Sequence, residues 1–212
     1  MKRILIIERE YGAGGGVIAE KAAHRLGWKL LDRELTEEIA RLAKVHPEVC
    51  QKREERIDPW MYRLAKVFWR GSHERSVHFN DAQILDADRL VSLSQQVVEQ
   101  AAMAGDCVIV GRGAPYFLRD RDDAFCVFLY ASREAKFHRV WQRTKNDEEA
   151  IDLVDSVDQE RAEFIEYYFK VQWPSRHLYH AMLNTDTGLD ETVNAILYSM
   201  DVANQKAGVD KA

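Results

Sequence analysis

The chain has 212 residues, with 30 Lys and Arg against 35 Asp and Glu, which gives a formal net charge of −5. With 46% hydrophobic and 31% charged residues, its composition is that of a globular protein and excludes collagen-like, low-complexity and wholly disordered chains. The acidic balance argues against binding to a nucleic-acid polymer. It leaves room for a site that takes one small phosphorylated molecule, because such a site needs only local positive charge.

The cysteines and the N-terminus favour a cytoplasmic protein. Cys50, Cys107 and Cys126 lack the C-x-x-C spacing of zinc and redox sites. Cys107 and Cys126 lie in apolar runs, so we expect them to be small core residues in a reducing compartment. The apolar run at 4–7 is far too short for a signal peptide or a membrane span. We therefore expect no association with a membrane.

Apolar runs alternate with helical patterns along the chain. We expect strands at 3–8, 28–32, 107–110, 124–130 and 178–183. We expect helices at 17–26, 34–71, 87–104, 133–143 and 191–202, the second broken at Pro47 and Pro59. Strands separated by helices predict an α/β fold, a parallel sheet covered on both sides. One domain over residues 1–205 is expected, with a frayed polar tail at 206–212.

An aromatic stripe occurs inside the second helical region. Trp60, Leu64, Val67 and Phe68 recur at helical spacing. Such a stripe is typical of core packing or of a contact between subunits. A homodimer is therefore compatible with the sequence.

A glycine-rich turn joins the first strand to the first helix. Glycine allows positive φ and lets the backbone approach a ligand closely. The free N–H groups at the start of the following helix favour an anion. The turn therefore predicts a phosphate cradle at Gly12, Ala13, Gly14, Gly15, Gly16 and Val17.

The spacing of the turn departs from both common nucleotide-binding patterns. In a G-x-x-x-x-G-K-[ST] loop, Arg9 stands at the first glycine, Gly15 at the lysine and Gly16 at the Ser/Thr. In a G-x-G-x-x-G pattern, Val17 falls on the third glycine. A tight left-handed turn without a ligand is the alternative.

Several short motifs occur along the chain. They are Arg-Glu-Tyr-Gly-Ala-Gly-Gly at 9–15, Asp-Arg-Glu-Leu at 32–35, Gly-Arg at 111–112, a strand ending in Ala-Ser at 125–132, Asp-x-x-Arg-Ala at 158–162, and Leu-Tyr and Asn-Thr at 178–179 and 184–185. In this combination the chain resembles the cytidylate kinase-like family of bacterial proteins over nearly its full length. The Asp of a Gly-Arg-Asp segment is replaced by Gly113, and the loop lysine is absent.

The resemblance implies a P-loop kinase-like three-layer fold with a five-stranded parallel sheet. It implies a helical acceptor-binding insert at 34–85 and an arginine lid at 145–177. It also implies transfer of a phosphoryl group from ATP, with Mg²⁺, to a nucleoside monophosphate such as CMP or dCMP.

Arginines are the candidates for phosphate contact, because a guanidinium grips phosphate oxygens in bidentate fashion. Arg112, at the exit of a buried strand, is the best candidate for the acceptor phosphate; a surface ion pair is its alternative. Arg33 follows a strand and is a second substrate-binding candidate. Arg139 and Arg143 share a helix face, so both can reach one site or pair with the acidic residues at 148–149 in solvent.

The remaining candidates concern the lid and the metal. Arg161 with Asp158 forms either a lid element over the phosphates or a helix-surface pair. Arg112, Arg143 and Arg161 are together the predicted catalytic residues. Glu8 and Asp32, each at the carboxyl end of a strand, can hold Mg²⁺ through water; Asp32 is also a substrate-binding candidate.

Two functional hypotheses follow. The first is an active nucleoside monophosphate kinase, and the second is a non-catalytic, nucleotide-binding regulatory protein on a kinase scaffold. The missing lysine motivates the second. A kinase for another small phosphorylated or hydroxylated acceptor is a weaker third reading, because the fold does not fix the substrate.

Overall fold

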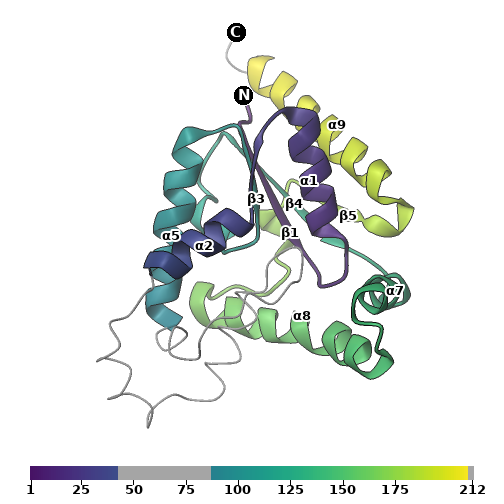
Figure 1. Cartoon of the computed structure of the whole chain (residues 1–212). Helices are drawn as coiled ribbons and strands as arrows, with labels where there is room; N and C mark the ends of the chain where they lie inside the picture. Colours follow the sequence, from purple (N-terminus) through teal and green to yellow (C-terminus); the bar gives the residue numbers. More distant parts are fainter. Residues whose placement is uncertain (43–86, 210–212) are drawn as a thin grey trace, which may run out of the picture.

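The computed structural model describes residues 1–42 and 87–209, which form an α/β fold around one parallel sheet (Figure 1). The strand order is β2-β3-β1-β4-β5. The strands are β1 (Ile4–Arg9), β2 (Lys29–Leu31), β3 (Cys107–Val110), β4 (Ala124–Tyr130) and β5 (Ala181–Asn184).

Helices cover both faces of this sheet. The helices are α1 (Gly15–Leu26), α2 (Arg33–Leu42), α5 (Ala87–Ala104), α6 (Ala114–Phe117), α7 (Arg133–Thr144), α8 (Asp147–Phe169) and α9 (Leu189–Val209), with short 3-10 turns at Arg176–Leu178 and Thr185–Thr187. Helices α1 and α9 lie on one face, and α2 and α5 lie on the other (Figure 1). The α/β three-layer prediction is confirmed.

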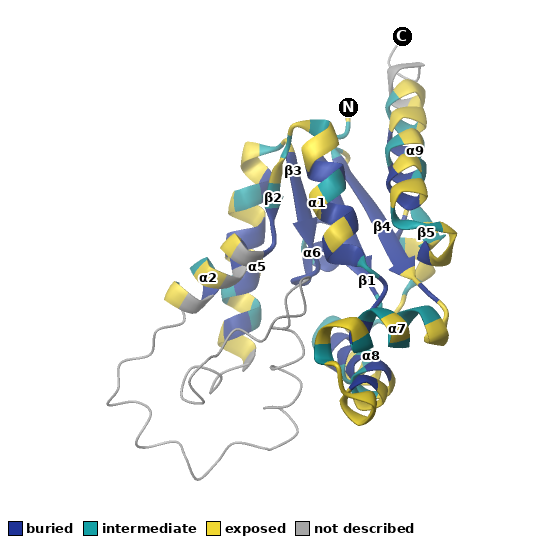
Figure 2. Ribbon diagram, turned by 45° about the vertical axis from the view of Figure 1, so that its right-hand side comes forward, coloured by how far each residue is buried: buried dark blue, intermediate teal, exposed yellow. Residues whose placement is uncertain are grey.

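The central strand, β1, shows why helices must pack on both faces of the sheet. Every residue of β1 is buried. Ile4 and Ile6 point into the core under α2 and α5, whereas Leu5 and Ile7 point into the core under α1 and α9. Successive side chains of a strand alternate between faces, so a continuous apolar run requires helices on both sides. Figure 2 shows this as a dark blue sheet between helices with exposed outer sides.

Several predicted boundaries match the structure. The predicted first and last residues of β3, β4 and α5 agree with the structure. The fifth strand begins later than predicted, at Ala181, because the 3-10 turn Arg176–Leu178 precedes it. The predicted frayed tail is wrong for residues 206–209, since α9 continues to Val209. Ala203 packs on the core one turn earlier, and the good helix formers Gln205, Lys206 and Ala207 follow it.

Other predictions lie outside the described residues. These are the Pro47 and Pro59 breaks, the 60–68 stripe, Cys50, most of the 34–85 insert, and residues 210–212. Cys107 and Cys126 are buried core residues, as predicted. In the part of the chain that the structure describes, no helix is both long and apolar enough to cross a membrane.

The region predicted as a lid contains one long helix, α8, for which the sequence analysis names no element. Helix α8 packs against α7 and passes across the carboxyl ends of the strands (Figure 1). Its buried side chains include Val154 and Val157, which pack with Val140 of α7. Helices α7 and α8 therefore lie at the sheet edge where the predicted site residues emerge.

Candidate functional site

The glycine-rich turn has the backbone geometry of an anion cradle. Gly12 and Gly14 have φ of 77° and 79°, in the left-handed region that glycine adopts without strain. Helix α1 begins at Gly15, and its first intrahelical bond runs from Ile18 N–H to Gly14 O at 3.1 Å. The N–H groups before Ile18 therefore have no partner inside the helix, and the first turn carries no acidic side chain.

Buried charge gathers beside this turn. Within residues 1–42 and 87–209, the buried charged side chains are Glu8, Arg9, Asp32, Arg112 and Arg161. We call these five residues the buried charge cluster. They come from the carboxyl ends of β1, β2 and β3 and from helix α8. Three of the five are guanidiniums, and Arg161 also pairs with Asp158, whose side chain is 17% exposed. The cluster therefore concentrates phosphate-binding groups at one end of the sheet.

Arg112 holds an unusual backbone position in the cluster. It has a φ of 58° between Gly111 at 63° and Gly113 at 74°. A non-glycine residue in this region is uncommon; Lys145 and Lys170 also adopt it, but as C-terminal caps of α7 and α8. Burial lowers the pKa of Arg112 to about 10; the charge of Asp32 opposes this shift, and the charges of Arg9 and Arg161 add to it. Arg112 is therefore not a surface ion pair.

Arg161 and Asp158 form a pair that is largely buried rather than a helix-surface pair. The Arg161 guanidinium donates to Asp158 Oδ1 at 2.9 Å and to the backbone oxygen of Arg9 at 2.8 Å. It also lies over the ring of Trp173, 5.3 Å from the centroid. Helix α8 is thus joined directly to the end of β1.

Asp158 also contacts the glycine-rich turn and a lysine that the sequence analysis missed. Its Oδ1 accepts the N–H of Tyr11 at 2.8 Å, and its Oδ2 lies 3.3 Å from Lys136 Nζ. Lys136 Nζ lies 3.0 Å from Glu10 Oε2. Burial lowers the pKa of Lys136, but the two carboxylates outweigh it and the net pKa is raised, so Lys136 is charged. Lys136 shares a helix face with Arg139 and Arg143, a spacing that could have identified it.

Arg139 and Arg143 both reach the glycine-rich turn, as their spacing predicts. Arg139 donates to Gly12 O at 3.2 Å and to Thr185 at the end of β5, with distances of 3.0 Å to Oγ1 and 3.1 Å to O. Arg143 donates to the Tyr11 hydroxyl and lies over its ring. Both arginines hold the outer side of the turn and lie outside the buried charge cluster.

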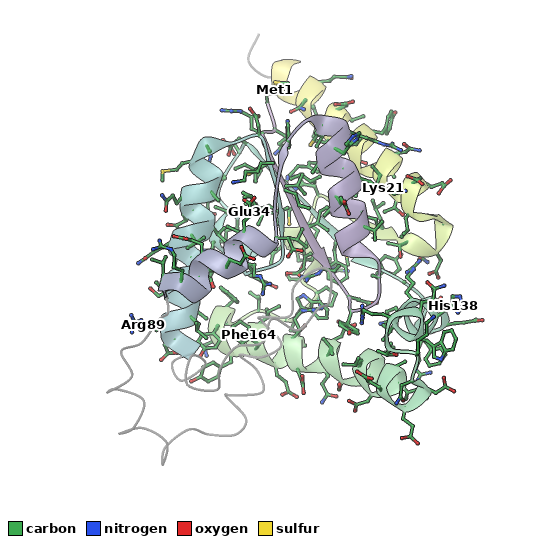
Figure 3. The ribbon with its side chains drawn as sticks, in the orientation of Figure 1. Met1, Lys21, Glu34, Arg89, His138 and Phe164 are labelled. Atoms are coloured by element: carbon green, nitrogen blue, oxygen red, sulfur yellow. The ribbon has the colours of Figure 1, made fainter. Side chains whose placement is uncertain are left out.

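The remaining predicted residues are placed as follows. Arg33 is the first residue of α2, but its side chain lies outside what the structure describes. The Glu8 carboxylate accepts the N–H of Arg9 at 3.1 Å. No group of three or more His, Cys, Asp or Glu side chains among the described residues is arranged to hold a metal ion. Lys21, on the outer side of α1, binds Asp190 at 2.7 Å (Figure 3).

Comparison with known proteins identifies the family. The model of the cytidylate kinase-like family matches residues 4–187, which includes the glycine-rich turn and the whole buried charge cluster. The chain belongs to the cytidylate kinase-like family. No curated protein matches the sequence.

Several solved structures share the fold of this chain at low sequence identity. An uncharacterized protein from Eubacterium ventriosum ATCC 27560 has 22% identity and a TM-score of 0.64, with 95% of this chain and 99% of that one covered. A gluconokinase from Sinorhizobium meliloti 1021 has 14% identity and a TM-score of 0.58, with both chains covered in full. A shikimate kinase from Acinetobacter baumannii in complex with shikimate has 17% identity and a TM-score of 0.52, with 96% and 95% covered. The fold is therefore that of P-loop kinases.

Proposed function

We propose that this protein transfers the γ-phosphoryl group of ATP to a nucleoside monophosphate, with CMP or dCMP as the first acceptors to test. One observation carries the proposal. The buried charged residues of the described chain gather beside the N–H groups that open α1, and three of them are guanidiniums, which bind phosphate oxygens. Family membership supports nucleotide-dependent phosphotransfer at this place.

The two substrates are assigned to different parts of the site. The donor phosphates would lie on the N–H groups of the glycine-rich turn, residues 12–17, which offer an anion the positive end of helix α1. The acceptor phosphate would bind Arg112, which emerges from β3 at the edge where parallel sheets bind ligands. Asp32 follows β2 at the same edge and is assigned to the acceptor as well.

The reaction needs little from the protein beyond position and charge. An oxygen of the acceptor phosphate forms a bond to the γ-phosphorus, the bond from that phosphorus to its bridging oxygen breaks, and the electron pair leaves with ADP. A phosphate monoester is largely a dianion near neutral pH, so no base has to remove a proton. A hydroxyl acceptor would differ, because a carboxylate such as Asp32 would have to take its proton.

The carboxylates of this site fit Mg²⁺ only together with a bound nucleotide. Mg²⁺ is usually held by one or two carboxylates, water and substrate phosphates, and Glu8 and Asp32 can supply that many. When bound, the ion neutralises charge on the β- and γ-phosphates. The guanidiniums of the cluster share that task, because they lie at the same sheet edge.

Coupled detection of ADP release tests the proposal, with ATP, Mg²⁺ and a panel of monophosphates. We expect turnover with at least one acceptor and a loss of about 100-fold or more in Arg112→Ala, since a residue that stabilises transition-state charge contributes on that scale. Arg119→Ala is the matched control, because Arg119 is exposed and pairs only with Asp120 in the structure. Absence of turnover with every acceptor contradicts the proposal.

A second function is favoured by the glycines at positions 15 and 16, where a phosphate-binding loop has Lys and Ser/Thr. This function is regulatory nucleotide binding without catalysis. Calorimetry separates the two, because saturable nucleotide binding without turnover supports regulation. Absence of any nucleotide binding contradicts both.

Another acceptor class is the third candidate. Two structural neighbours are a shikimate kinase and a gluconokinase, and shikimate and gluconate carry hydroxyls and a carboxylate. Both compounds therefore belong in the acceptor panel. The cytoplasmic location and the homodimer stay predictions from the sequence; light scattering of the full chain tests the homodimer.

A further inference from the structure

Two departures from the phosphate-binding loop pattern occur together in this chain. In G-x-x-x-x-G-K-[ST], the lysine directly follows the second glycine. Gly15 holds the lysine position here, and Arg9 holds the position of the first glycine. Compared with that pattern, the loop lacks a cation at position 15 and has one at position 9.

The structure shows that the two positions share one volume. A Cβ placed on Gly15 would lie 2.8 Å from Arg9 Cγ, 3.2 Å from its Cβ and 3.4 Å from its Cδ. The Arg9 side chain therefore fills the space beside α1 into which a side chain at position 15 would extend. Its guanidinium continues to Gly111, where an added Cβ would collide with Arg9 Nη1.

The Arg9 guanidinium consequently lies between the two halves of the proposed site. On one side is the start of α1, which is assigned to the donor phosphates. On the other is the Gly111–Gly113 turn, which carries Arg112 for the acceptor. Arg9 is only 8% exposed, and its charge reaches Arg112, whose pKa it helps to lower. A phosphoryl group in transfer has to pass through the region between these halves.

Glu8 contacts the Arg9 guanidinium at long range. Arg9 Nη1 lies 3.5 Å from Glu8 Oε1, which is long for a charge-assisted hydrogen bond. The same Glu8 oxygen also accepts the backbone N–H of Arg9. A phosphate oxygen that approached the guanidinium more closely would form a stronger hydrogen bond than Glu8 does.

We propose that Arg9 contacts the β- and γ-phosphates of the donor and replaces the missing loop lysine from the first position of the loop. This assignment rests on the proposed kinase function and makes Arg9 a further catalytic residue. Its guanidinium would stabilise the negative charge that gathers on the bridging oxygen as the bond to the γ-phosphorus breaks and ADP leaves.

Calorimetric titration of the full chain with ATP and with ADP, both with Mg²⁺, tests the role of Arg9. We expect Arg9→Met, which keeps volume and removes charge, to lose about tenfold or more in ATP affinity, as the loss of a hydrogen bond to a charged group predicts. ADP affinity should fall less, because ADP has no γ-phosphate. Thermal unfolding of each variant checks that it is folded.

Exchanging the cation between the two positions is the sharper test. Gly15→Lys alone should lose ATP affinity, because its Cβ collides with Arg9. The double variant Arg9→Gly, Gly15→Lys should recover most of the ATP affinity. The matched control Arg9→Gly, Gly15→Met has a side chain of similar volume without charge and should not recover it. Recovery of ATP affinity to the same level in both double variants would show that Arg9 only packs the turn, and overturns the proposal.

The outcomes separate this inference from the function on which it rests. If the wild-type chain does not bind ATP, the proposed function fails and the role of Arg9 fails with it. If the wild-type chain binds ATP and Arg9→Met binds it equally well, only the role of Arg9 is overturned. Loss of ATP affinity in Arg9→Met, with recovery in the double variant Arg9→Gly, Gly15→Lys, supports both.

Discussion

The two edges of the sheet carry the same residue types in opposite arrangements. At the amino edge, Arg3 pairs with Asp106 at 2.8 Å and Arg121 with Asp123 at 2.7 Å, one cation to one anion, and the side chains are between 32% and 55% exposed. At the carboxyl edge, the members of the buried charge cluster are at most 8% exposed. The difference teaches that residue type alone does not reveal a site, whereas the burial of several charged side chains at one place does.

The difference in burial between the two edges also affects the stability of the fold. An exposed pair contributes little to stability, because water solvates both partners. A buried guanidinium costs stability unless an anion compensates it. The carboxyl edge is therefore the part of the fold that a bound phosphate group would stabilise most.

The largest loss of stability is expected when the carboxyl edge loses Asp158, the carboxylate through which α8 contacts α7 and the turn. Asp158→Ala leaves Lys136 and Arg161 without a shared carboxylate and frees the N–H of Tyr11. We expect a loss of about 4 kcal/mol in the free energy of unfolding, as for other broken buried pairs, measured by urea denaturation.

The control for Asp158 lies one turn earlier on the same helix. Asp155 pairs with Arg133 in solvent, with side chains 51% and 62% exposed. Asp155→Ala should leave the unfolding midpoint nearly unchanged. Similar losses in the two variants would show that the contrast between buried and exposed pairs does not hold in this protein.

An intermediate effect is expected from glycines of the two edges. Gly113 at the carboxyl edge and Gly105 at the amino edge have φ of 74° and 67°. A Cβ on Gly113 would lie 2.7 Å from the Phe117 ring, whereas one on Gly105 would meet only the far end of the Arg3 side chain at 2.8 Å. We expect Gly113→Ala to cost about 3 kcal/mol and Gly105→Ala about 1 kcal/mol. Thermal unfolding measures both, and the reverse order would contradict the comparison.

The smallest effect is expected at the amino edge itself. The bidentate hydrogen bond from Arg121 lowers the pKa of Asp123. Its stabilisation is therefore present above the ordinary pKa of an aspartate and is lost as the pH falls through the lowered value. Arg121→Ala should cost about 0.5 kcal/mol at neutral pH. A difference in denaturation midpoint that persists in acid, where Asp123 is protonated in both proteins, would rule out this cause.

Much of the fold could be predicted from the sequence because its strands are continuous apolar runs. Those runs set β3 and β4 to the residue. Helix α8 was harder to predict, because its N-terminal half is rich in charged residues. The structure shows that this half buries only a narrow stripe, Ala150, Val154 and Val157, at helical spacing.

The candidate site could be predicted in part. Arg112 and Arg161 were predicted because each lies in a motif, and the structure brings them into one cluster. The contacts of Lys136 and Tyr11 could not be predicted, because they depend on how α7 and α8 meet the turn. The position of Arg9 against Gly15 is likewise a tertiary fact, since no spacing rule places a side chain from the strand beside the start of the following helix.

The space that Arg9 shares with Gly15 and Gly111 restricts how this loop can change during evolution. As long as an arginine stands at position 9, both glycines are required by its side chain, so a mutation that restores lysine at position 15 is disfavoured on its own. A lineage that exchanges one form of the loop for the other has to change position 9 first or change both together. Homologues should therefore divide into two groups. One has arginine at position 9 and glycine at position 15, the other has glycine at position 9 and lysine at position 15, and few chains should combine the two.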